Sequence, residues 1–162
     1  MTLTDTNVPI LAIDPGNERS GWVVYDGVDV LKCGIWPNEQ LLQAIDGGIG
    51  VNSAHLAIEM VASYGMPVGR TVFDTCVWIG EFKNAFGRNN ATLVYRKDVK
   101  MHLCGTMRAK DSNIRQAIMD RYGSTRRVVL GTKKDPGPLY GMTGDMWAAL
   151  GVALTFWETR GA

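Results

Sequence analysis

The sequence has few of the features that mark membrane, secreted or repetitive proteins. No apolar run approaches the roughly eighteen residues that a membrane-spanning helix requires, and the N-terminal residues include no basic stretch of the kind that begins a signal peptide. The three cysteines are far apart and form no C-x-x-C pair. We therefore expect a protein of a reducing cytoplasm that does not bind membranes.

No repeat, low-complexity tract or linker divides the 162 residues. With 46% apolar and 20% charged residues, the composition is that of an ordinary globular protein. A chain of this length can bury one hydrophobic core without disulfides or a structural metal. We expect a single domain that spans residues 1–162.

The net charge of +1 conceals an uneven distribution. Residues 1–94 carry five basic and ten acidic side chains, whereas residues 95–162 carry twelve basic and six acidic ones. This asymmetry suits a protein that holds a polyanion against a carboxylate site, although solvated helix faces explain the same charges.

The hydrophobic pattern predicts an α/β or α+β sandwich, in which helices flank a mixed sheet. Apolar runs bounded by turn residues predict strands at Ile10–Asp14, Gly21–Tyr25, Val28–Ile35, Ala54–Met60 and Thr92–Tyr95. Apolar residues at helical spacing predict helices at Glu39–Ile45, Thr71–Phe86, Asp111–Tyr122 and from about Thr143 to Thr159. Asp26-Gly27 predicts a two-residue type I′ hairpin turn, and Ser124–Gly141 is expected to be a loop.

Three carboxylates stand at positions from which they can reach a ligand. Asp14 ends an apolar strand before a Pro-Gly turn, Glu59 lies within a buried strand, and Asp145 lies in the first turn of the last helix. Each has a structural alternative: a turn-forming Asp, a salt-bridged Glu, and an Asp that favours the helix dipole. Together they form the oxygen ligand set that Mg²⁺ prefers, and such ions activate water for phosphodiester hydrolysis.

Four segments, in this order, resemble the RuvC-type Holliday junction resolvases, a family of ribonuclease-H-like nucleases. Ile10–Gly21 is similar to the family's first-strand Asp motif, and Ala57–Glu59 to its central-strand Glu. Val99–Asp111 is similar to its V-K…G…A-x-K segment, and Asp145–Ala153 to its D-x-x-D-A-L-A-V-A helix. The resemblance covers most of the chain, and small phage-encoded members look most similar.

The resemblance implies a ribonuclease-H-like mixed sheet of five strands, the first three antiparallel, flanked by helices. It implies a metal-dependent endodeoxyribonuclease that resolves four-way junctions by two-metal hydrolysis, leaving 5′-phosphate and 3′-hydroxyl ends. Asp14, Glu59 and Asp145 would hold Mg²⁺, for which Mn²⁺ can substitute, and Lys100 and Lys110 would lie near the scissile phosphate.

The chain departs from the family pattern at three points. Ala148 stands where the last helix has its second Asp if Asp145 is the first, so one carboxylate of the usual four is missing. A match shifted by three residues makes Asp145 the second Asp and leaves Met142 in place of the first. Lys110 is displaced by one position, and Tyr64 is the nearest candidate for the aromatic that often follows the central Glu.

Partners follow from the same resemblance. Branched DNA is the expected substrate, with candidate DNA contacts at Tyr64, Arg70, Arg96, Lys97, Arg108 and Arg115. For each basic residue, a solvated surface charge is the alternative. The resemblance also implies a homodimer, for which the Thr71–Phe86 helix is the candidate interface, in a bacterial or phage-infected cytoplasm.

Other functions fit parts of the pattern. A nuclease for flaps, Y-structures or RNA–DNA hybrids would use the same metal site, because the site does not select the substrate. A junction-binding protein that lost catalysis with the fourth carboxylate is another alternative. An actin-like ATPase also begins with D-x-G-x-x-x-x-G, but such proteins pack two domains of this kind around the nucleotide, and 162 residues supply one.

Overall fold

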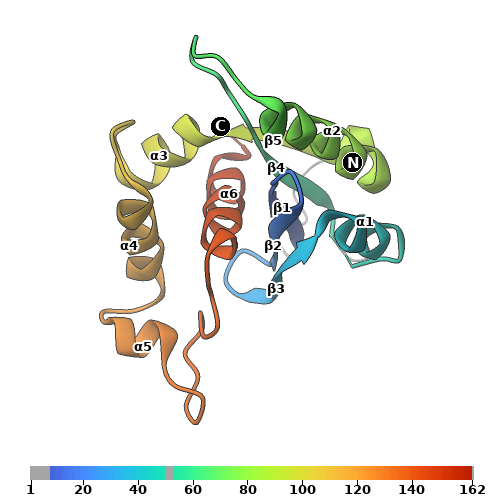
Figure 1. Ribbon diagram of the computed structural model, residues 1–162. Coiled ribbons are helices and arrows are strands. Elements are labelled where there is room, and N and C mark those ends of the chain that lie inside the picture. Colours follow the sequence, from blue (N-terminus) through green and yellow to red (C-terminus); the bar gives the residue numbers. More distant parts are fainter. Residues whose placement is uncertain (1–7, 50–52, 162) are drawn as a thin grey trace.

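The protein, described here from a computed structural model, is built on one mixed sheet (Figure 1). The structure describes residues 8–49 and 53–161. The strand order is β3-β2-β1-β4-β5. The strands are β1 (Ile10–Asp14), β2 (Arg19–Tyr25), β3 (Val30–Pro37), β4 (His55–Met60) and β5 (Ala91–Tyr95). The first three are antiparallel and β1, β4 and β5 are parallel, which confirms the predicted sheet.

Helices cover both faces of this sheet (Figure 1). One face packs against α1 (Asn38–Asp46) and α2 (Arg70–Phe86). The other packs against α6 (Asp145–Thr159), beside which lie α3 (Arg96–Cys104), α4 (Asp111–Tyr122) and α5 (Arg126–Leu130). Strand β1 divides its side chains between the two layers because alternate residues of a strand point to opposite faces. Leu11 and Ile13 belong to the α1–α2 side, and Ile10 and Ala12 to the α6 side.

Helix α6 is the central element of its layer. Ten of its fifteen residues are buried, which is why the sequence around it reads as almost continuously apolar. Its small residues allow close packing: Cβ on Gly151 would lie 3.3 Å from a methyl group of Val99 on α3. Gly151 thus lets α3 pack closely against the middle of α6.

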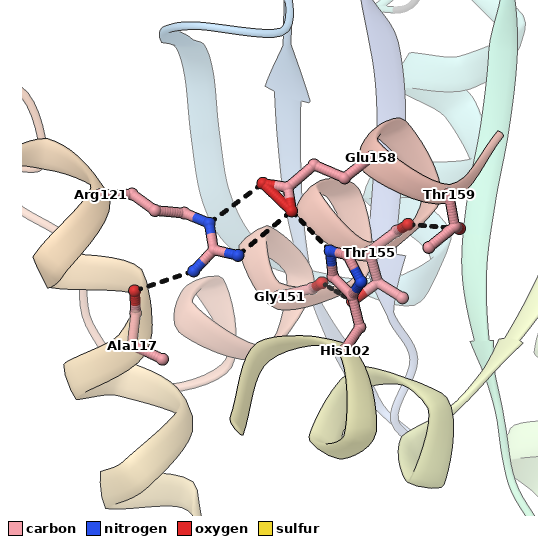
Figure 2. A network of polar contacts seen from close by, with 7 residues as sticks. All are labelled: His102, Ala117, Arg121, Gly151, Thr155, Glu158 and Thr159. Carbon is pink, nitrogen blue, oxygen red and sulfur yellow. Dashed lines mark hydrogen bonds and ion pairs between the residues drawn. The ribbon is translucent and has the colours of Figure 1, made fainter. Parts of the chain in front are cut away.

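A polar network joins three helices at the other end of α6 (Figure 2). Glu158 accepts hydrogen bonds from Arg121 Nε at 3.0 Å and Nη2 at 3.1 Å, and its Oε2 also contacts His102 Nε2. Arg121 donates further to the carbonyl of Ala117 on its own helix. The network therefore ties α3 and α4 to the last turn of α6.

Several local expectations differ from the structure. The β2–β3 hairpin has a four-residue loop, because Tyr25 pairs with Val30 and the Asp26 carboxylate accepts hydrogen bonds from the backbone N–H groups of Val28 and Asp29. Strand β3 accordingly begins at Val30. The expected loop Ser124–Gly141 contains α5, which Thr125 caps by accepting a hydrogen bond from Val128 N–H.

Helix α3 was not expected from the sequence. It buries only Val99 among its nine residues, so it has no apolar stripe that the hydrophobic pattern could reveal. Among the described residues, no helix is both long and apolar enough to cross a membrane.

Candidate active site

Asp14 is the last residue of β1 and Glu59 the next-to-last residue of the adjacent parallel strand β4, at the same level. The β1–β4 register pairs Ile13 with Ile58, so Asp14 and Glu59 are the next residues along. Both point to the α6 face, since Ala12 and Ala57, two residues earlier, belong to that layer. Glu59 is only 8% exposed. The sheet thus brings two predicted site residues together on the face toward α6.

Asp145 is brought to the same place by the way α6 begins. Gly144 precedes the helix with φ of 46°, a left-handed conformation that disfavours residues with a side chain. Gly21, which pairs with Asp14 across β1 and β2, has no Cβ, and one added there would lie 2.5 Å from the carbonyl oxygen of Asp145. The close approach of the start of α6 to strands β1 and β2 therefore depends on this glycine.

The three carboxylates line one open cavity of about 470 Å³. Its other polar lining residues are Arg96, Asp111 and Arg115. Arg96 begins α3 directly after β5, and Asp111 and Arg115 lie in the first turns of α4. Asp111 was expected at the start of a helix and at the end of the Val99–Asp111 segment that resembles the family motif, but not as a site residue.

The site carries unbalanced negative charge at its buried end. Burial, a hydrogen bond shared with Glu59 and repulsion from Glu59 and Asp145 together raise the pKa of Asp14 from 3.8 to about 9. Arg96 acts in the opposite direction. Without an additional cation, the buried pair therefore favours holding a proton on Asp14.

Arg96 bridges two acids of the cavity. Its Nη1 lies 3.6 Å from Glu59 Oε1, and its Nη2 forms an ion pair with Asp111. The arginine side chain is 30% exposed, Glu59 is 10% exposed at its side chain, and Asp111 is 81% exposed. Arg96 thus reaches inward to the buried carboxylates, while its second partner lies in solvent.

A buried hydrogen-bond network holds the turn that follows Asp14. Ser20 donates its hydroxyl to Asn38 Oδ1 at 2.6 Å, and Asn38 Nδ2 donates to the carbonyl of Gly16 at 2.8 Å. Gly16 N–H donates to Ser20 Oγ at 3.2 Å. Ser20 and Asn38 are 0% and 1% exposed. The network fixes the backbone beside the Asp14 carboxylate, and the sequence analysis did not identify it.

A second cavity of about 290 Å³ opens on the other side of the Asp14–Glu59 pair. It is mainly apolar and is lined by Met60, Val68 and Tyr64 among others. Tyr64 is 63% exposed and has φ of 50°, in the left-handed region. The predicted stacking residue is therefore next to the carboxylates and accessible.

The other predicted residues lie at varying positions around this centre. Lys100 is half-buried on α3 and Lys110 is exposed before α4, and neither lines either cavity. Arg70, Lys97 and Arg108 are exposed outside both cavities, and Arg70 Nε lies 3.7 Å from Asp74. The guanidinium of Arg115 lies 5.4 Å from the centre of the Trp147 ring.

Ala148 occupies the position on α6 where the family pattern has a second Asp. Ala148 lines the large cavity, one helical turn beyond Asp145. Asp135, the other acid near in sequence, lies in the turn between the bridged residues Gly131 and Pro136 and does not line the cavity. The fourth carboxylate that lines the cavity is Asp111, which comes from the start of α4 and not from α6.

The donor set fits a hard divalent cation. Carboxylate oxygens are the ligands that Mg²⁺ prefers, and a cation would relieve the repulsion that raises the pKa of Asp14. Within residues 8–49 and 53–161, however, no three Asp, Glu, His or Cys side chains are close enough to form a metal-binding group. The Asp14–Glu59 pair is thus the preformed part, and the Asp145 carboxylate would have to turn toward it.

Comparisons with known proteins identify the fold. No protein-family model and no curated protein sequence matches this chain. The structure of RuvC from Thermus thermophilus is similar with a TM-score of 0.63 and 17% identity over 94% of this chain and 95% of that one. RuvC from the same organism in complex with a Holliday junction substrate is similar with a TM-score of 0.64 and 17% identity, over 95% and 96%. The chain therefore has the RuvC-like, ribonuclease-H-like fold that the sequence predicted.

Proposed function

We propose that the protein is a divalent-metal-dependent endonuclease that cuts branched DNA, with the four-way junction as its substrate. The observation that carries this proposal is the convergence of Asp14, Glu59 and Asp145 on one cavity at the edge of the sheet. Three elements far apart in the sequence supply them. A fold that serves structure alone has no need to bury two adjacent carboxylates there.

The residues have distinct chemical roles in this proposal. Asp14 and Glu59 hold Mg²⁺, or Mn²⁺ in its place, and Asp145 completes the carboxylate set. When bound, such an ion supplies an activated water and stabilises the leaving oxygen of the phosphodiester. Arg96, in contact with Glu59, lies where a phosphate oxygen would gain negative charge in the transition state. Lys100 and Lys110 would act on neighbouring phosphates, since they lie outside the cavity.

Branched DNA as substrate has two supports. The similar Thermus thermophilus RuvC structure contains a Holliday junction, although 17% identity transfers only the fold. Residues 95–162 carry twelve basic and six acidic side chains, and two of the basic ones, Arg96 and Arg115, line the cavity, which suits a polyanion. The exposed Arg70, Lys97, Arg108 and Arg115 and the accessible Tyr64 remain the proposed DNA contacts. A homodimer through α2, a phage origin and a cytoplasmic location also remain predictions.

Cleavage of synthetic DNA tests the proposal. A panel of a four-way junction, a Y-structure, a flap, an RNA–DNA hybrid and a linear duplex is incubated with the protein in Mg²⁺. The four-way junction should be cut fastest, and Asp14→Asn and Glu59→Gln should each abolish cutting. Asp120→Asn, an exposed carboxylate on α4, is the matched control and should cut like the wild type. Equal cutting by Asp14→Asn would eliminate the proposed metal site.

A second candidate is a junction-binding protein without catalysis. The observation that favours it is Ala148 at the position of the missing carboxylate, together with the incomplete convergence of the remaining three. Tight binding of the four-way junction without any cleavage in Mg²⁺ or Mn²⁺ would support this function over the nuclease.

A further inference from the structure

The charges that line the large cavity balance with one divalent ion. Four carboxylates, those of Asp14, Glu59, Asp111 and Asp145, face two guanidinium groups, those of Arg96 and Arg115. With Asp14 ionised, as metal binding requires, the formal charge of the lining is therefore −2, which a single divalent cation neutralises. A second divalent ion in the same cavity would bring an excess of positive charge before DNA arrives.

Arg96 is the positive group closest to the buried acids. Its Nη1 lies 3.6 Å from Glu59 Oε1, and it also acts electrostatically on Asp14. The residue follows Tyr95, the last residue of β5, and begins α3, so its backbone is fixed beside the end of β4, where Glu59 is the next-to-last residue. The guanidinium accordingly occupies space beside the carboxylates that a second ion would need.

Arg115 does not have this position. Its guanidinium lies 5.4 Å from the centre of the Trp147 ring, and its residue is exposed at the cavity wall. Lys100 and Lys110 lie outside the cavity. Of the basic residues that line the cavity, Arg96 alone forms an ion pair with a buried carboxylate of the site.

The second partner of Arg96, Asp111, is exposed to solvent, unlike Glu59. Asp111 forms an ion pair with Arg96 Nη2, yet its side chain is 81% exposed and lies at the start of α4. An exposed ion pair contributes little free energy, so a stronger ligand can displace Asp111 at low cost. A DNA phosphate is such a ligand, because guanidinium binds phosphate through two parallel hydrogen bonds.

We propose that Arg96 takes the place of a second metal ion, so that each chain binds one divalent ion, and that Asp111 holds the guanidinium until a DNA phosphate replaces it. This inference rests on the proposed nuclease function and specifies how its site works. The two-ion arrangement expected from the sequence is the alternative. The absent carboxylate at Ala148 is consistent with one ion, since a site with one ion needs fewer acidic ligands.

Counting bound Mn²⁺ tests the first part. Titration of the full chain with Mn²⁺, followed by electron paramagnetic resonance, should give one ion per chain for the wild type and for Arg96→Lys. The double variant Arg96→Ala/Ala148→Asp, which removes the cation and adds a carboxylate, should bind two. Two ions on the wild type would overturn the inference and leave the nuclease function standing. A double variant that still binds one ion would overturn the role of Arg96, and no binding at all would overturn both proposals.

Junction binding in EDTA tests the second part without metal or cleavage. Arg96→Ala should weaken binding about tenfold and lower the slope of log Kd against log salt by about one, as expected for the loss of one phosphate contact. Asp111→Asn should tighten binding, because the guanidinium is then free for phosphate. Lys32→Ala, the same charge change on β3, the edge strand farthest from β5, should leave the slope unchanged. Equal Kd values for Arg96→Ala and the wild type would overturn the phosphate-binding role.

Discussion

Gly21 permits Asp145 to lie against the end of the sheet. A Cβ on Gly21 would lie 2.5 Å from the carbonyl carbon and oxygen of Asp145 and 2.7 Å from its Cβ. Because Gly21 pairs with Asp14 across β1 and β2, the same glycine sets the distance between two of the three carboxylates. The site therefore depends on a residue that carries no chemistry of its own.

Gly21→Ala should separate α6 from the sheet edge. The added methyl group meets backbone atoms, which cannot move away alone, so we expect a loss of about 1–3 kcal/mol in the free energy of unfolding. Mn²⁺ affinity should fall by about tenfold or more, since displaced supporting groups have effects of that size. Calorimetric titration with Mn²⁺ and urea denaturation measure the two effects.

Gly80→Ala is the control for this variant. Nothing lies within 4 Å of a Cβ at Gly80, which is an exposed position within α2. Alanine is favoured over glycine inside a helix by about 0.5–1 kcal/mol, so this variant should be slightly more stable and should bind Mn²⁺ normally. Unchanged Mn²⁺ affinity in Gly21→Ala would show that Asp145 takes no part in metal binding.

The metal-free protein should lose stability as the pH rises. The folded-state pKa of Asp14 is raised from 3.8 to about 9, so the folded protein keeps a proton that the unfolded chain releases. The associated stability is fully present below about pH 4 and is lost as the pH rises toward 9, by at most about 1.4 kcal/mol per pH unit. Urea denaturation in EDTA at pH 6 and pH 8 measures this slope.

Asp14→Asn removes the titrating group and provides the comparison. The variant should show a smaller fall in stability between pH 6 and pH 8 and should be more stable than the wild type at pH 8 in EDTA. Added Mg²⁺ should stabilise the wild type and leave the variant unchanged, because a ligand stabilises only the state that binds it. Equal pH slopes for the two proteins would contradict the account of the buried carboxylate pair.

Asn38→Ala should weaken metal binding indirectly, through the turn that follows Asp14. The substitution leaves the Ser20 hydroxyl and the Gly16 carbonyl without their buried partner, which costs about 1–3 kcal/mol of stability. The turn after Asp14 then relaxes, and Mn²⁺ affinity should fall by about tenfold. Thr155→Val removes a buried hydrogen bond on α6 and should reduce stability without changing Mn²⁺ affinity. If Asn38→Ala and Thr155→Val lost Mn²⁺ affinity equally, the Ser20–Asn38 network would have no specific role in positioning Asp14.

Glu158→Gln tests the network that joins the helices (Figure 2). Partial burial raises the pKa of Glu158, but hydrogen bonds from Arg121 and His102 lower it more, so the net direction is downward. The contribution to stability is present above the ordinary pKa of Glu and is lost as the pH falls through the lowered folded-state value. The variant should lose up to about 1 kcal/mol at pH 7, less at high salt, and nothing in strong acid. Denaturation of Glu81→Gln, an exposed acid on α2, provides the baseline.

The sequence was sufficient for the strands of the sheet, because apolar runs that end at turn residues marked them. It also located Asp14 and Glu59 on strands of one sheet, and their role as metal ligands stays a prediction. The position of Asp145 depended on the resemblance, since a helix of ten buried residues does not reveal which of its ends meets the sheet edge.

What the sequence could not show depends on contacts between distant residues. Arg96 and Asp111 are fifteen positions apart and form a pair only because α3, a helix without an apolar stripe, turns the chain back toward the site. The Asn38–Ser20 network likewise joins α1 to β2 through side chains that are common in turns and helix ends. Local patterns do not encode such pairs.

The central claim is that Asp14, Glu59 and Asp145 share a divalent ion, and a crystal structure with Mn²⁺ tests it most directly. The account predicts an anomalous scattering peak between the carboxylates of Asp14 and Glu59, at ligand distances of about 2.0–2.3 Å, with the Asp145 side chain turned toward it. A map at saturating Mn²⁺ with no peak at this pair of carboxylates would contradict it.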